Sequence, residues 1–223
     1  MKKKNLALFD LDDTLFDGDT EGEWVKYMDQ AGLIQDPEFF NEMESFGKSY
    51  RQGDLNVDEY SEFLLSPLVG KNLKELEDKI DIFTSDVIDR LTDELTEELL
   101  LKHRDDTKIL TSGSLTFLVK VIGQKMGIET CFGTDPEYKD NVFTGKVEGS
   151  PNFSEEKVRR IKIWMQSNHF EKIFAYSDSI HDLPLLEFSD IPSAISPDKK
   201  LLKVAEERKW MIEGRRNITR SLP

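Results

Sequence analysis

The sequence predicts an α/β fold in which helices wind around both faces of a parallel sheet and an all-helical lobe is inserted after the first strand. One observation is the apolar segment 6–9, which is followed directly by acidic residues. Another is helical periodicity through residues 16–104, after which short apolar strands alternate with helices. Alternating strands and helices form βαβ units, which require a parallel sheet.

The composition places the chain among globular proteins. Its 223 residues suffice for one large domain or for a core with an inserted lobe, and 38% are apolar and 33% charged. The lysines at 2–4 precede an apolar stretch that is too short for a signal peptide, and no run approaches the ~20 residues of a membrane span. We therefore expect a cytoplasmic protein. Cys131 is the only cysteine, which excludes an internal disulfide and a cysteine metal cluster.

The net charge of −14 lies entirely in the predicted lobe. Residues 16–104 contain 23 acidic and 9 basic residues, whereas the predicted core, 1–15 and 105–223, contains 21 of each. Such a surface disfavours nucleic acid and anionic membranes as partners. Acidic helix faces that keep the lobe soluble are the simplest explanation, and a preference for cationic groups is the other.

The lobe is predicted to be helical because its apolar residues recur at spacings of three and four. Pro37 and Asn56 are candidate helix starts, and Gly32 and Gly53 are candidate ends. The expected helices are Glu23–Ala31, Pro37–Tyr50, Val57–Ser66, Leu73–Ile82 and Ser85–Leu101.

Strands and helices alternate after the lobe. Gly127 is expected to end the first of these helices, and Ser154 to cap the second through a capping box. The expected strands are Thr107–Thr111, Thr130–Phe132, Lys172–Tyr176 and Ser193–Ile195, with a small hairpin at Val142–Val147. The expected helices are Leu115–Met126, Glu155–Gln166, Leu183–Glu187 and Lys199–Lys209. The tail after Gly214 is basic, and we expect it to be loose.

Asp10 and Asp12 directly follow the first predicted strand. The carboxyl ends of parallel strands face the ligand crevice, and strand alternation directs both side chains to the same side. Two converging carboxylates favour a divalent cation and acid–base catalysis. The alternative is an acidic turn without function, because Asp is common in turns.

Further polar residues stand at the ends of other predicted elements. Ser112 and Asp178 follow strands, and Lys157 lies at a helix start. In a parallel sheet these positions meet at one crevice. Acids, a hydroxyl and an amine together suit phosphoryl transfer, in which cations neutralise the phosphate, donors orient it and a nucleophile attacks in line. A carboxylate can be that nucleophile.

With these residues in this order, the chain resembles the haloacid dehalogenase-like phosphatases, in the phosphoserine phosphatase-like branch (subfamily IB) with a helical cap. Four motifs, which span the core, carry the resemblance: Phe9–Leu15 is similar to DxDx[TV]L, Ile109–Ser112 to a strand ending in Ser, Lys157 to the family lysine, and Tyr176–Asp182 to GDSxxD. One such motif is weak support, but four in order with fitting spacing are strong. The resemblance implies a Rossmann-like core.

The resemblance also implies roles for these residues in a Mg²⁺-dependent reaction through a phospho-aspartate. Asp10 would be the nucleophile and a metal ligand. Asp12 would protonate the leaving oxygen and then activate water, and its main-chain carbonyl would face the metal. Asp178 would complete the ligands, and Asp182 would bind the metal or support a ligand. The phosphate would be bound by Thr14, Ser112, Gly113 and Lys157.

The chain departs from the family pattern at Ser177, where glycine is usual. Glycine permits a tight turn and close approach of the backbone. A serine restricts the backbone and adds a hydroxyl, so we expect it to reduce activity or to shift the phosphate slightly. The metal-binding Asp178 remains.

The lobe is expected to act as a cap that closes over the site and restricts it to small molecules. In phosphoserine phosphatases a glutamate at the start of the cap contacts the substrate's amino group, and Asp19, Glu21 and Glu23 occupy that region here. Arg51 lies near a family arginine that holds a carboxylate.

The expected substrate is therefore a small phosphomonoester with an amino group, such as phosphoserine or histidinol phosphate. The alternatives are a phosphotransferase or mutase that uses the same aspartyl-phosphate, and a non-enzymatic binding module of this family. The residues indicate neither the physiological substrate nor the oligomeric state.

Overall fold

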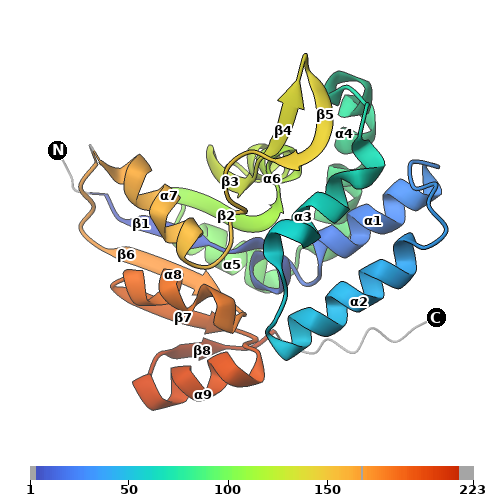
Figure 1. Ribbon diagram of the computed structural model, residues 1–223. Helices are drawn as coiled ribbons and strands as arrows, with labels where there is room; N and C mark the ends of the chain where they lie inside the picture. Colours follow the sequence, from blue (N-terminus) through green and yellow to red (C-terminus); the bar gives the residue numbers. More distant parts are fainter. Residues whose placement is uncertain (1–3, 167, 216–223) are drawn as a thin grey trace, which may run out of the picture.

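The computed structural model describes residues 4–166 and 168–215, and the basic tail lies outside the described residues, apart from its first residue (Figure 1). Six parallel strands form one sheet in the order β3-β2-β1-β6-β7-β8. The strands are β1 Leu6–Phe9, β2 Thr107–Leu115, β3 Thr130–Thr134, β6 Ile173–Ser177, β7 Ile191–Ile195 and β8 Met211–Glu213. Helices cover both faces, which confirms the predicted doubly wound α/β fold.

The central strand β1 is buried on both faces, as expected for a parallel sheet between helical layers. Leu6 and Leu8 pack in one apolar cluster with residues of α7 Glu155–Met165, α8 Leu183–Phe188 and α9 Lys199–Arg208. Ala7 and Phe9 alternate with them and face the other cluster. Phe9 is in register with Leu110 of β2 and Tyr176 of β6, so these three strands end at the same edge of the sheet.

The inserted segment is helical wherever it has regular structure in the described residues. Its helices are α1 Thr20–Gln30, α2 Phe39–Gln52, α3 Val57–Leu65, α4 Leu73–Leu91 and α5 Glu94–Lys102, with a short 3₁₀ turn at Ser66–Leu68. Asn56 caps α3, and Gly53 ends α2 in a left-handed conformation, as predicted. This arrangement supports the proposed division into a core, 1–15 and 105–223, and a cap, 16–104.

The predicted helix break between Ile82 and Ser85 was wrong. Helix α4 runs through this point because Phe83, Thr84 and Val87 are buried on one continuous face. The chain breaks instead before α5, where the Asp93 side chain accepts a hydrogen bond from the main-chain N–H of Thr96. The Thr96 hydroxyl accepts one in return from the Asp93 N–H, which completes a capping box.

Two expectations in the core also need correction. Val142–Val147 is only the second strand, β5, of a hairpin whose first strand is β4 Pro136–Lys139, because the turn falls at Asp140–Asn141, where φ is 53° and 65°. Ser154 precedes α7 but does not cap it: its backbone φ is positive, at 50°, and its hydroxyl accepts no hydrogen bond from the first N–H groups, contacting the carboxylate of Glu155 instead. The remaining core helix, α6 Thr116–Lys125, ends just before Gly127 as expected.

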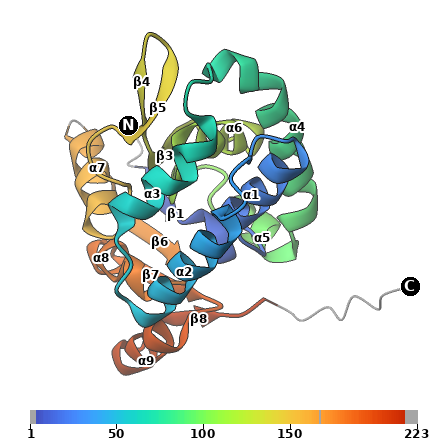
Figure 2. The ribbon, with the colours of Figure 1, turned by 45° about the vertical axis from the view of Figure 1, so that its right-hand side comes forward.

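The hairpin binds the cap to the core (Figure 2). The N–H of Gly70 donates to the carbonyl of Phe143 at 3.0 Å, and the N–H of Phe143 donates to the carbonyl of Lys71 at 3.0 Å. Lys146 also pairs with Glu62 of α3 at 2.6 Å. These contacts fix the α3 side of the cap over the sheet edge where β1, β2 and β6 end. In the part of the chain that is described, no helix combines the length and apolarity needed to cross a membrane.

Candidate active site

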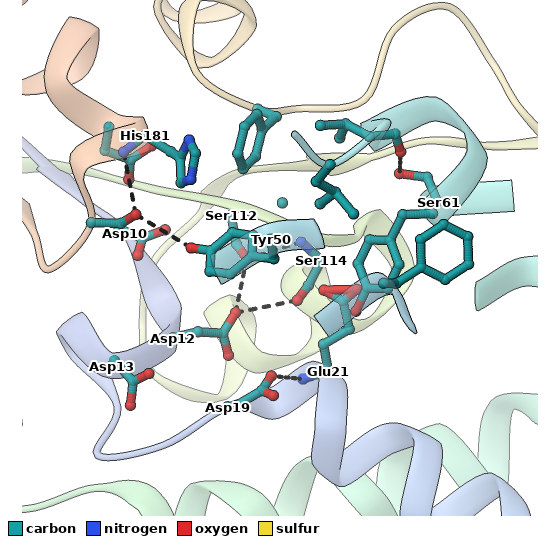
Figure 3. A pocket seen from close by; sticks show the side chains of 18 of the residues that line it. Asp10, Asp12, Asp13, Asp19, Glu21, Tyr50, Ser61, Ser112, Ser114 and His181 are labelled. Carbon is teal, nitrogen blue, oxygen red and sulfur yellow. Dashed lines mark hydrogen bonds between the residues drawn. The ribbon is translucent and has the colours of Figure 1, made fainter. Parts of the chain in front are cut away.

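The chain leaves β1 through a single distorted helical turn, Leu11–Leu15. Leu11 and Leu15 are fully buried and anchor the turn, while Asp13 takes a left-handed conformation with φ of 52°. Asp is one of the few residues that tolerate this conformation. As a result Asp10 and Asp12 both line one cavity of about 340 Å³ between the sheet edge and the cap, as the sequence predicts (Figure 3).

Asp10 is paired with Lys157, whose buried amine lies 2.8 Å from Asp10 Oδ1 and 2.7 Å from Asp182 Oδ2. The amide of Asn152 donates to Thr111 Oγ1 at 3.0 Å and thereby ties the loop before Lys157 to β2. Burial raises the pKa of Asp10 to about 7, although Lys157 opposes the rise. The ion pair therefore only partly compensates the buried carboxylates around it.

Four donors hold the carboxylate of Asp12. The N–H of Thr20 donates at 2.6 Å and its hydroxyl also donates to Oδ1, while the hydroxyls of Ser112 and Ser114 each donate to Oδ2 at 3.2 Å. Burial, followed by repulsion from Asp19, raises the pKa of Asp12 to about 6. A carboxyl group that titrates close to neutrality and is fixed in position suits a general acid and base.

Asp178 also lines the cavity and is held by Thr14. The Thr14 hydroxyl donates to Asp178 Oδ1 at 3.0 Å and accepts from the Asp178 N–H at 2.9 Å. Thr14, predicted to bind phosphate, thus orients Asp178 and does not line the cavity. Burial, with repulsion from Asp10 next, raises the pKa of Asp178 to about 8.

The donor set fits a hard divalent cation. Asp10 is buried and Asp178 is half-buried, and a cation between these two carboxylates would remove their mutual repulsion. Within residues 4–166 and 168–215, no three His, Cys, Asp or Glu side chains are grouped as a metal site.

The departure at Ser177 has a clear structural role. Its buried hydroxyl donates to Asp182 Oδ2 at 2.9 Å and accepts from the Ser179 N–H at 3.2 Å. Since the same Asp182 oxygen accepts from Lys157, two donors direct this carboxylate toward the lysine. Ser177 itself does not line the cavity, although Gly113 and Ser112 do.

The cap residues that were predicted to contact the substrate differ in whether they line the cavity. Asp19 lines the cavity but uses one oxygen to cap α1, accepting from the N–H of Glu21 at 2.9 Å and of Gly22 at 3.0 Å. Glu23 points away and pairs with Lys26 and Arg90 on the surface. Arg51 lines the cavity from the exposed end of α2.

Glu21 lines the cavity as well, and it does so from the first turn of α1 (Figure 3). Its carboxylate borders the open cavity on one side and is surrounded by protein on the others, where the hydroxyls of Tyr60 and Ser114 contact it. Burial, followed by repulsion from Asp19, raises the pKa of Glu21 to about 8. A half-buried carboxylate in the wall of a cavity can serve as a partner for a cationic group.

The sequence did not single out several residues that shape the cavity. Ser114 could have been found, because strand alternation places it on the same side as Ser112. The other residues in this group are mostly aromatic or apolar and come largely from cap helices and loops; they are Met43, Phe46, Tyr50, Leu55, Val57, Tyr60, Phe153 and Ser179. His181, within the fourth motif, also lines the cavity.

Known proteins with similar sequences and structures were found. A family model described as haloacid dehalogenase-like hydrolase matches residues 7–187. A protein named histidinol-phosphatase from Neisseria meningitidis serogroup C (strain 8013) is 32% identical, covering 94% of this chain and 98% of that protein. A phosphoserine phosphatase from Methanocaldococcus jannaschii is 27% identical, covering 91% and 90%. The crystal structure of a protein of unknown function from Bordetella pertussis Tohama I is 30% identical with a TM-score of 0.86, covering 95% and 99%.

The role of Ser177 can be tested by its replacement with alanine. Ser177→Ala leaves the buried carboxylate of Asp182 with one donor fewer, so we expect the free energy of unfolding to fall by about 1–3 kcal/mol in urea denaturation at pH 8. Ser193→Ala is the matched control, because Ser193 is equally buried in β7 and its hydroxyl has no hydrogen-bond partner among the described residues. Equal stability changes for the two variants would contradict this role.

Proposed function

We propose that this chain, a phosphatase that belongs to the haloacid dehalogenase-like hydrolase family, hydrolyses a small amino-bearing phosphomonoester through a phosphorylated Asp10. The observation that carries this proposal is the placement of two differently held carboxylates in one cavity. Asp10 is ion-paired with Lys157, and Asp12 is fixed by four hydrogen bonds. Different environments give the two acids different tasks.

In the proposed reaction the carboxylate of Asp10 attacks phosphorus, and the bond from phosphorus to the ester oxygen breaks. Asp12 donates its proton to that leaving oxygen, so that an alcohol departs. The resulting Asp12 carboxylate then takes a proton from water, whose oxygen attacks phosphorus and releases inorganic phosphate and Asp10. A pKa of about 6 makes both protonation states of Asp12 accessible near neutral pH.

The phosphate would be held by the hydroxyl of Ser112, the main chain at Gly113 and the amine of Lys157, all of which border the cavity. We propose that Asp10, Asp178 and the carbonyl of Asp12 hold Mg²⁺, which would neutralise phosphate oxygens. Asp182 is proposed to position Lys157, since its carboxylate is engaged by that lysine and by Ser177.

The nature of the alcohol follows from the cap. The cavity of about 340 Å³ suits a small molecule, and Glu21 provides a carboxylate for an ammonium group. The proteins named histidinol-phosphatase and phosphoserine phosphatase both carry names of amino-bearing esters, which supports this class.

Binding of Mg²⁺ should stabilise the protein in a pH-dependent way. The pKa values of Asp10 and Asp178 are raised to about 7 and about 8, so stability declines as the pH rises from about 4 to these values and both carboxyls lose protons. Protons compete with the cation for the same oxygens. Saturating Mg²⁺ should therefore raise Tm by about 5–10 °C at pH 8.5, and by less at pH 6.

The control for this measurement separates the site from the acidic surface. Asp178→Asn should remove most of the Mg²⁺-induced rise in Tm, whereas Asp105→Asn, at an exposed position far from the cavity, should preserve it. A rise that is the same in both variants would show that the cation binds elsewhere.

Glu21 should determine the preference for amino-bearing esters. In Glu21→Gln the ratio of kcat/KM for histidinol phosphate or phosphoserine to that for glycerol phosphate should fall about 10–100-fold, the value of one charged hydrogen bond. Because the pKa of Glu21 is about 8, its ionised fraction grows through that pH, and the wild-type ratio should rise between pH 7 and 8.5. Glu23→Gln should keep both features, and a loss of selectivity there as large as in Glu21→Gln would refute the assignment.

A further inference from the structure

We infer that the cavity selects, among amino-bearing phosphomonoesters, those whose alcohol carries a planar ring and lacks a carboxylate, and that Tyr50, Phe153 and His181 contact this ring. The inference rests on the proposed phosphatase function and adds to it the chemical class of the alcohol. Two features of the cavity support it. One is a cluster of aromatic rings among the lining residues, and the other is the small number of lysine and arginine side chains among the described residues that line it.

The ring cluster joins three separate segments of the chain. The imidazole of His181, in the turn after β6, lies between Tyr50 of α2 and Phe153 of the loop before α7, with ring centroids 5.1 Å and 5.0 Å away. The Tyr50 hydroxyl is 3.3 Å from Ser179 Oγ, which brings the cap residue down to the core (Figure 3). All three rings line the cavity, so they offer aromatic surface to a bound molecule.

The ring cluster and the amine-binding acid belong to the same cavity. Tyr60 contacts Glu21 through its hydroxyl and packs against Phe46 of α2, with ring centroids 5.3 Å apart. Tyr50 lies one helical turn beyond Phe46, so α2 presents aromatic side chains from the side of Glu21 to the side of His181. A single small molecule can therefore place its ammonium at Glu21 and its ring against these side chains.

The charges of the cavity disfavour a carboxylate on the substrate. Seven Asp and Glu side chains line it, and in the described part of the chain Lys157 and Arg51 are the only lysine and arginine that do so. The amine of Lys157 is already shared by Asp10 and Asp182.

Arg51 is the remaining cation among these lining residues, and it lies at the exposed end of α2. A substrate carboxylate would thus leave water for a predominantly negative wall without a buried cationic partner, which is unfavourable. The charges that line the cavity therefore favour an amine on the substrate and disfavour a carboxylate.

The inference is tested by comparing kcat/KM for four esters, with release of inorganic phosphate as the readout. Phenylalaninol phosphate and histidinol phosphate have a ring and an amine, ethanolamine phosphate has only the amine, and phosphoserine has an amine and a carboxylate. We expect the two ring esters to exceed ethanolamine phosphate by about tenfold or more, and phosphoserine to rank last. Phosphoserine as the best substrate, or equal values for phenylalaninol phosphate and ethanolamine phosphate, would overturn the inference and leave the phosphatase function intact.

Two variants of Tyr50 assign the preference to the ring cluster. Tyr50→Leu should lower the ratio of kcat/KM for phenylalaninol phosphate to that for ethanolamine phosphate at least about fivefold, whereas Tyr50→Phe keeps the ring and should keep the ratio. Phe40→Leu, an equivalent change at an exposed position of the same helix outside the cavity, should also keep it. A ratio that Tyr50→Leu leaves unchanged would refute the role of Tyr50. Release of phosphate from none of the esters would overturn the phosphatase function and the inference with it.

Discussion

The amine of Lys157, held between the carboxylates of Asp10 and Asp182, is the interaction on which the rest of the site depends. It joins the end of β1, the start of α7 and the turn after β6, three segments that are distant in the sequence. A buried charge without partners is strongly destabilising, so this pair constrains all three segments to one arrangement. Ser177 and Asn152 extend the constraint by fixing Asp182 and the loop that leads to the lysine.

One lysine does not balance the acids around it. Burial raises the pKa values of Asp10, Asp12, Glu21 and Asp178, and in the described part of the chain the cavity that they line has only Lys157 and Arg51 as lysine and arginine. Clusters of carboxyl groups with raised pKa values are characteristic of functional sites, which lower the stability of the folded protein but provide groups for binding and catalysis. A divalent cation at Asp10 and an ammonium group at Glu21 would each relieve part of the repulsion, so the same imbalance explains both proposed ligands.

The position of the insertion links the proposed cap to Asp12. The cap begins directly after the turn that carries Asp12, and its first helix supplies Thr20, which donates twice to that carboxylate. A shift of α1 would therefore disturb the carboxylate of Asp12 as well as Glu21. The hairpin β4–β5 holds the α3 side of the cap through main-chain hydrogen bonds, whereas α2 reaches the core at the cavity mouth through Tyr50.

The sheet and the meeting of Asp10, Asp12, Ser112, Lys157 and Asp178 in one cavity were predictable, because the ends of apolar parallel strands must share an edge. Which of the cap acids lines the cavity could not be predicted, because α1 begins at Thr20 and the sequence predicted a start at Glu23. Two residues apart on a helix, Glu21 and Glu23 face different sides. The contact of Thr14 with Asp178 and the aromatic wall from α2 depend on how distant segments pack, which no local pattern encodes. The strand β8 was missed because it has only three residues at a sheet edge.

The central claim, that Asp10 is the nucleophile and Asp12 the acid and base, is tested most directly by trapping the covalent intermediate. Asp12→Asn can still form the acyl phosphate from an ester with a good leaving group, but it lacks the base that activates water. After rapid acid quench, mass spectrometry of the peptide that contains residues 6–15 should show one added phosphoryl group on Asp10. A phosphoryl group on another residue, or steady release of inorganic phosphate at the wild-type rate with no adduct, would contradict the account.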